Sequence, residues 1–109
     1  MEYNIPVKND QYHKAMLMIL NFKLGLSNME IDMVSTLLNN NITVIDTEAR
    51  EIIRKTLDKD KYITNNYIQR LRNKNIFVVK PADKNLYLNP DLIDIIKEGE
   101  VSFKFKIYE

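Results

Sequence analysis

Residues 64–74 read TNNYIQRLRNK, and this stretch decides the predicted fold. On a helix, where each residue turns by about 100°, Thr64, Ile68 and Leu71 share one apolar face. The opposite face carries amides and Arg70, and the stretch holds no carboxylate, which a face selected only for solubility usually includes. Amides pair with adenine and arginine with guanine or phosphate, so these side chains suit a base-reading helix.

The elements predicted around this helix follow the order helix, turn, helix, strand, turn, strand. Apolar spacing, helix caps and turn residues define them. They are a helix at 48–57 capped by Asp46 or Thr47, a polar turn at 58–63, a helix from Asn65 to about Lys74 capped by Thr64, a strand at 76–80, a turn at 81–85 and a strand at 86–88.

Residues 47–88 resemble the winged helix-turn-helix superfamily. The run RNKNI at 72–76 is similar to the family's basic run that ends in Gly before the first wing strand, and KPADK at 80–84 looks like the wing tip. Asn75 replaces the usual Gly, and Asn tolerates the left-handed conformation. The resemblance implies duplex binding, with the helix in the major groove and the wing on the backbone or minor groove. Its apolar positions are Ile52, Ile53, Leu57, Ile63, Tyr67, Ile68 and Leu71.

Charge is unevenly distributed along the chain. Residues 50–84 contain ten Lys or Arg and four Asp or Glu, a net of +6, whereas the remainder carries a net of −5. A basic central segment flanked by acidic segments can orient a domain on a phosphate backbone. The alternative is that these basic residues only form a solvated face. The candidate base-edge residues are Asn65, Asn66, Gln69 and Arg70, and the candidate phosphate contacts are Arg54, Lys55, Lys59, Lys61, Arg72, Lys74, Lys80 and Lys84.

The flanking sequence predicts further helices and a terminal strand. A helix at 12–24 ends at Gly25, Ser27 and Glu30 form a capping box for a helix to about Asn39, and residues 42–45 form a brief strand or an extended link. Pro90 follows Asn89 in a short helix to Lys97, and apolar residues alternate in a strand at 101–107. We therefore expect an α+β, mainly helical winged helix with a β-wing and a C-terminal β-strand, organised as an arm at 1–10 and one domain at 11–109.

The terminal strand has two interpretations. It either covers the core of its own domain or pairs as an edge with a neighbouring chain, giving a homo-oligomer or a contact with a protein partner. The candidate residues for such an interface lie in the arm and the strand, and they are Ile5, Val7, Phe103, Phe105 and Ile107.

Several function classes are unfavoured by composition. The chain has no cysteine, so it can form neither disulfides nor thiolate sites. Its single histidine, His13, is almost no basis for a His-based zinc site or a catalytic triad. No Gly-rich phosphate loop occurs, and no apolar run is long enough to span a bilayer or to suggest a secretory signal. We expect no enzyme, no cofactor, no metal and no membrane partner.

The first functional hypothesis is therefore a non-enzymatic module that binds duplex DNA. The alternative is a structural adaptor that uses the same body for protein–protein assembly, since a fold does not fix a function. The chain is rich in Ile, Asn and Lys, with 14, 13 and 12 of each, which indicates an AT-rich genome such as that of a bacteriophage or mobile element. The expected location is the cytoplasm, or a virion for the alternative.

Overall fold

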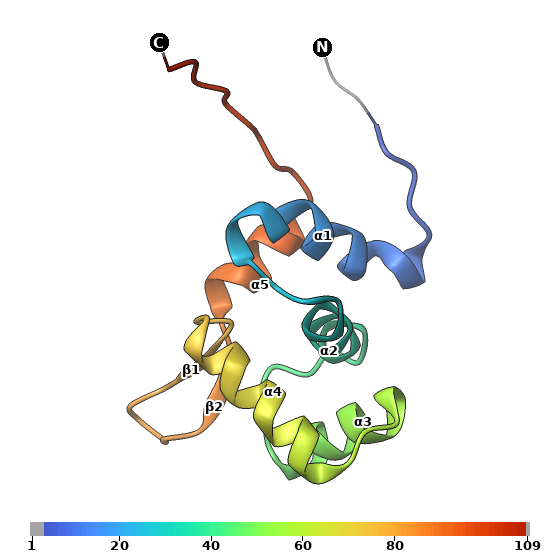
Figure 1. The fold of residues 1–109 in the computed structure, drawn as a ribbon, viewed down its shortest axis with the longest axis vertical. Coiled ribbons are helices and arrows are strands. Elements are labelled where there is room, and N and C mark those ends of the chain that lie inside the picture. The colour runs from blue at the N-terminus through green and yellow to red at the C-terminus, as the bar shows by residue number, and fades with distance from the viewer. Residues whose placement is uncertain (1–3, 109) are drawn as a thin grey trace.

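Helices make up most of residues 4–108, the part of the chain that the computed structural model describes, and one small antiparallel sheet completes an α+β fold (Figure 1). Residues 1–3 of the predicted arm and Glu109 lie outside the described residues, and the division into arm and domain stays a prediction. The elements are a 3₁₀ helix at Asn9–Gln11, α1 (Tyr12–Leu24), α2 (Asn28–Asn39), α3 (Thr47–Leu57), α4 (Lys61–Asn73), β1 (Phe77–Val79), β2 (Leu86–Leu88) and α5 (Pro90–Glu98).

The turn between α1 and α2 forms as predicted. Gly25 ends α1 in the left-handed conformation at φ +65°, where its N–H donates to the Asn21 carbonyl at 3.0 Å. Ser27 begins α2 with the capping box: its Oγ accepts the Glu30 N–H at 3.2 Å, and Glu30 Oε1 accepts the Ser27 N–H at 2.9 Å. The helix that follows lies at the centre of the core, with Ile31, Met33, Val34 and Leu37 all buried.

α3 and α4 are both capped by aspartate. Asp46 Oδ1 accepts the Ala49 N–H at 2.8 Å, which decides between the two predicted caps of α3. The prediction that Thr64 caps α4 is wrong, because Asp60 Oδ1 accepts the Ile63 N–H at 2.8 Å and the helix begins at Lys61. Thr64 is buried one turn into the helix, and its hydroxyl donates to the Asp60 carbonyl at 2.8 Å. A carboxylate is the better acceptor at the positive end of a helix, so the earlier of the two possible caps wins.

β1 and β2 pair as the predicted hairpin, with Phe77 opposite Leu88 and Val79 opposite Leu86. The residues at 42–45, predicted as a brief strand or an extended link, lie along the other edge of β2. Val44 forms an isolated bridge with Tyr87, the Ile45 N–H donates to the Leu86 carbonyl, and the Leu88 N–H donates to the Thr43 carbonyl, both at 2.8 Å. The segment between α2 and α3 thus fixes the base of the hairpin.

The strand predicted at 101–107 is not formed. Residues 99–108 are irregular in the structure and extend away from α5 at the end of the molecule where the N-terminal segment also emerges (Figure 1). Val101 is half-buried against the core and the Phe103 ring packs on Phe22, but no described residue offers this segment a ladder. Alternation of apolar residues indicates which face of a segment would be buried. A strand also requires a second strand that pairs with its backbone N–H and C=O groups.

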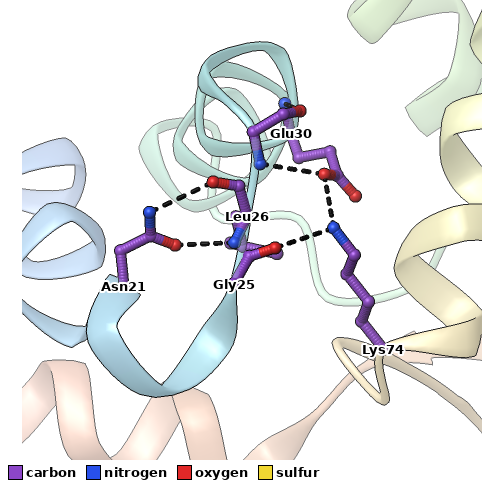
Figure 2. A network of polar contacts seen from close by, with 6 residues as sticks. Asn21, Gly25, Leu26, Glu30 and Lys74 are labelled. Atoms are coloured by element: carbon purple, nitrogen blue, oxygen red, sulfur yellow. Dashed lines mark hydrogen bonds and ion pairs between the residues drawn. The ribbon is translucent and has the colours of Figure 1, made fainter.

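A polar network joins the end of α4 to the turn between α1 and α2 (Figure 2). Lys74 Nζ donates to Glu30 Oε1 at 2.7 Å and to the Gly25 carbonyl at 2.8 Å. Asn21 completes the turn by accepting the Leu26 N–H and donating to the Leu26 carbonyl. Glu30 is only 2% exposed, and although burial raises its pKa, the hydrogen bonds from Lys74 and Ser27 lower it more, so the net pKa lies below its ordinary value.

Loss of this ion pair should destabilise the fold more than loss of a surface pair. We expect Lys74→Met, which leaves the Glu30 carboxylate buried and unpaired, to lower the free energy of unfolding by about 3–5 kcal/mol. Glu30→Gln should cost less, about 1–3 kcal/mol, because the amide keeps an acceptor. Urea unfolding followed by circular dichroism measures both. The control is Asp32→Asn, which removes an exposed pair with Lys14 and should change stability by less than about 1 kcal/mol.

The same pair predicts a pH dependence. The pKa of Glu30 is lowered in the folded chain, so the stability that it contributes is present above its ordinary value of 4.5 and is lost as the pH falls through the lower folded value. Urea midpoints measured from neutral pH to well below 4.5 should therefore fall less steeply for Glu30→Gln than for the wild-type chain. Parallel curves for the two proteins would contradict this role of Glu30.

Candidate nucleic-acid interface

The exposed face of α4 carries the predicted amides. Ile68 and Leu71 point into the core with Thr64, and the structure leaves Asn66 and Gln69 on the exposed side. This confirms the predicted division of the helix into two faces. The helix is however one turn longer at its start than predicted. The longer exposed stripe consists of Tyr62, Asn65, Asn66, Gln69 and Asn73.

Tyr62 is the residue that sequence reasoning missed on this face, and its side chain is 76% exposed. Tyr62 falls in the predicted turn at 58–63, because the predicted helix begins after Thr64. The signal that could have placed it is Asp60, a suitable cap three residues before Ile63. In a helix that enters the major groove, the N-terminal residues approach the base edges, so the first turn matters most.

The amides on this face take part in exposed contacts of modest strength. Asn65 Oδ1 accepts a hydrogen bond from Arg50 Nη1 at 3.0 Å, and Gln69 Nε2 donates to Asn73 Oδ1 at 3.2 Å. Asn66 is exposed beside them. Exposed side-chain pairs of this kind exchange readily with water or a ligand, because their net energy is small. The contacts hold the amides in place without burying them.

Arg70 lies at the side of the stripe, where its guanidinium sits 5.0 Å from the centre of the Tyr67 ring. Tyr67 is half-buried against the core, so the ring is a fixed platform. Attraction to an aromatic face lowers the freedom of an arginine, and Arg70 stays exposed. Arg70 is thus a pre-oriented donor.

Cations from α3 and the start of α4 surround a small hollow between the two helices. The hollow has a volume of about 160 Å³, and Arg50, Arg54 and Lys61 contribute to its lining together with Glu51. Arg54 Nε pairs with Glu51 Oε1 at 3.3 Å, which neutralises part of this cluster. Arg50 is a second residue that sequence reasoning missed, although it precedes Arg54 by one helical turn.

The other predicted phosphate contacts are distributed unequally. Lys55 is exposed near the end of α3, Lys59 is half-buried in the turn, and Arg72 is exposed on α4. Lys74 is instead held by Glu30 Oε1 and the Gly25 carbonyl, so we assign it to the fold and leave it out of the contact set. The structure therefore separates a cation that stabilises the end of α4 from those that face outward.

The loop between β1 and β2 is held by polar contacts around Tyr87. The Tyr87 hydroxyl donates to Asp83 Oδ2, Lys80 Nζ lies 4.1 Å from the centre of the Tyr87 ring, and Asp83 Oδ1 accepts the Asn85 N–H at 3.0 Å. The hydrogen bond from Tyr87 lowers the pKa of Asp83, and the same bond raises the pKa of Tyr87. Lys84 is exposed at the tip with φ +60°, so its ammonium is presented by a structured loop.

The candidate protein-interface residues lie at the other end of the molecule, beyond α1 and away from α3 (Figure 1). Phe105 and Ile107 are 93% and 90% exposed, and Ile5 is 71% exposed. Val7 and Phe103 are partly covered, with 40% and 50% exposed. Along the described residues, no helix combines the length and the apolar composition needed to cross a membrane.

Comparisons of the chain with family models, with curated proteins and with solved structures give no match.

Proposed function

We propose that this chain is a winged helix-turn-helix module that binds duplex DNA, with α4 in the major groove and the β1–β2 loop on the backbone. The observation that carries the proposal is the outward face of α4. Asn66 and Gln69 are exposed there with Arg70 beside them, and the helix contains no carboxylate. This combination offers donors and acceptors to base edges without repelling the phosphates.

The order of the elements supports the same proposal. α2, the extended residues 43–45, α3, α4 and the β1–β2 hairpin follow one another as helix, strand-like segment, helix, helix and hairpin. α3 packs against both α2 and α4, and α4 packs on β1. A helix supported in this way on its apolar side is rigid, which is what readout of base edges requires.

The outward residues divide by their chemistry. The amides and Arg70 are proposed to read base edges, and we add Tyr62 as a candidate at the start of the helix. Lys55, Lys59, Lys61, Arg72 and Lys84 are proposed to contact phosphates, which position a protein without specifying sequence. Arg54 and Lys80 keep a weaker place in this set, because each already interacts with a neighbouring side chain.

Binding should be salt-dependent. Fluorescence anisotropy of a labelled mixed-sequence duplex is expected to give a dissociation constant in the micromolar range, about 10⁻⁴–10⁻⁶ M, that weakens steeply as salt is added. Lys84→Ala should reduce the slope of log K against log salt by about 1. The control is Lys23→Ala, which changes the same charge on α1, away from the proposed interface. Absence of binding at low salt would contradict the proposal.

Base-edge and phosphate residues should behave differently. We expect Gln69→Ala and Arg70→Ala to relax sequence preference, with a loss of about 1–3 kcal/mol of discrimination for each bidentate contact removed. Lys84→Ala should weaken all sequences alike. Selection from a random duplex library followed by affinity measurements on selected and scrambled sites distinguishes the two effects. Identical behaviour of the three variants would contradict the placement of α4 in the groove.

The exposed apolar end favours a second candidate function, a structural adaptor that assembles through proteins and reads no DNA sequence. Ile5, Phe105 and Ile107 are each more than two-thirds exposed, which is costly for residues of this size unless a partner covers them. Under this proposal, loss of function maps to Phe105→Ser and Ile5→Ser in a partner-capture experiment. Arg70→Ala has no effect in that experiment.

A further inference from the structure

The segment at 100–106, which we call the tail, has an unpaired backbone and an uncovered apolar face. It leaves α5 at Gly99, where φ is +70°, and forms no ladder with the residues that the structure describes. Val101 is half-buried and Phe103 packs on Phe22 with the ring centres 5.4 Å apart, so the apolar face of the tail turns toward α1. Phe105 is 93% exposed, and in an extended strand it would share this face by alternation.

The N-terminal segment of the same chain is a poor partner for the tail. Its apolar residues Ile5 and Val7 flank Pro6, which has no N–H to donate to a ladder. A second tail has no such defect, because residues 100–106 contain neither proline nor glycine. We propose that two copies of this chain associate by pairing their tails as an antiparallel two-stranded ribbon.

Charge selects the register of this ribbon. Residues directly opposite each other in an antiparallel pair share a face, and like charges placed opposite are destabilising. Pairing about Phe103 sets Glu100 opposite Lys106 at both ends of the ribbon and Val101 opposite Phe105. Pairing about Lys104 sets two copies of that lysine opposite each other, and pairing about Phe105 sets Lys104 opposite Lys106. Pairing about Ser102 also joins opposite charges, Glu100 with Lys104, but it sets Phe105 and Lys106 opposite Gly99 and Glu98, where α5 ends, and leaves them outside the ladder. The register about Phe103 therefore keeps all of residues 100–106 in the ladder while it joins opposite charges and keeps like charges apart.

This register also covers the apolar side chains that the monomer leaves in water. In their own copy, Val101 packs against the core and Phe103 packs on Phe22 of α1. Phe105 then lies opposite Val101 of the second copy, on the side of the ribbon that faces the body of that copy, where Phe22 packs on Phe103 and is still 72% exposed. The end of α5 limits the ladder at Glu100, and two-fold symmetry limits it at Lys106.

Single cysteines test the register, because the chain has no cysteine of its own. Two cysteines at position 103 face each other with Cα atoms about 4.5–5.5 Å apart, within the range of a disulfide of about 4.4–6.8 Å. Cysteines at 102 or 104 meet only diagonally, at about 7–8 Å or more. Under mild oxidation Phe103→Cys should form a disulfide-linked dimer, whereas the matched controls Ser102→Cys and Lys104→Cys stay largely monomeric. Stronger linking through position 102 or position 104, or equal linking at all three, would overturn the proposal.

Charge reversal tests the association without touching the apolar face. Sedimentation equilibrium should show the dimer weakened about tenfold by Glu100→Lys and by Lys106→Glu, since each places like charges opposite at both ends of the ribbon. The double exchange E100K/K106E should restore the wild-type constant. A double variant as weak as the single ones, or a wild-type chain that is monomeric into the millimolar range, overturns the proposal.

Folding and function are separable in these experiments. Residues 100 and 106 are exposed and lie outside every helix and strand of the described chain, so circular dichroism should show the same helix content and melting temperature for all charge variants. Self-association is measured in the absence of nucleic acid. A failure of tail pairing therefore leaves the DNA-binding proposal standing, and the reverse also holds.

Discussion

The contact between Glu30 and Lys74 is the constraint on which the rest of the structure depends. One buried carboxylate oxygen accepts the Ser27 N–H that begins α2 and also the ammonium of Lys74 at the end of α4. The two junctions are 44 residues apart in the chain but share this single acceptor. Because Glu30 is 2% exposed, losing either donor leaves a buried charge less satisfied. The direction in which α4 leaves the core is therefore tied to the turn between α1 and α2.

The residues after Lys74 extend this anchor to the base of the hairpin. Asn75 adopts the left-handed conformation at φ +61°, which asparagine tolerates better than most residues do. Its carbonyl accepts a hydrogen bond from Asn89 Nδ2 at 2.9 Å, while Asn89 Oδ1 caps α5 through the Asp91 N–H. Asn89 thus links the end of α4 and the base of the hairpin to the start of α5. The exposed loop between β1 and β2 is stabilised by local contacts around Tyr87, and the packing of the helices does not depend on it.

The features that could be predicted from the sequence are those whose cause is local. The capping box of α2 and the cap of α5 each link residues no more than three apart, so the pattern alone contains the interaction. The start of α4 was missed because two residues able to cap it, Asp60 and Thr64, stand one turn apart. Contacts between residues far apart in the chain could not be predicted from the local sequence pattern. Nothing in the sequence indicates that Lys74, a plausible phosphate contact, meets Glu30, or that residues 43–45 lie beside β2.

The tail also shows that a local pattern does not identify a distant partner. Two of its alternating apolar residues, Val101 and Phe103, contact the body, whereas Phe105 and Ile107 are 93% and 90% exposed. The alternation cannot identify which backbone pairs with the tail, and within the described chain none does.

The outward face of α4 and the tail lie at different ends of the molecule, so the two surfaces would bind different partners (Figure 1). A cationic, amide-rich face needs a partner that brings charge and hydrogen bonds. An alternating apolar segment needs a partner that brings a backbone edge and an apolar face. The two surfaces share no residue, so each proposal can be tested by variants that leave the other surface unchanged.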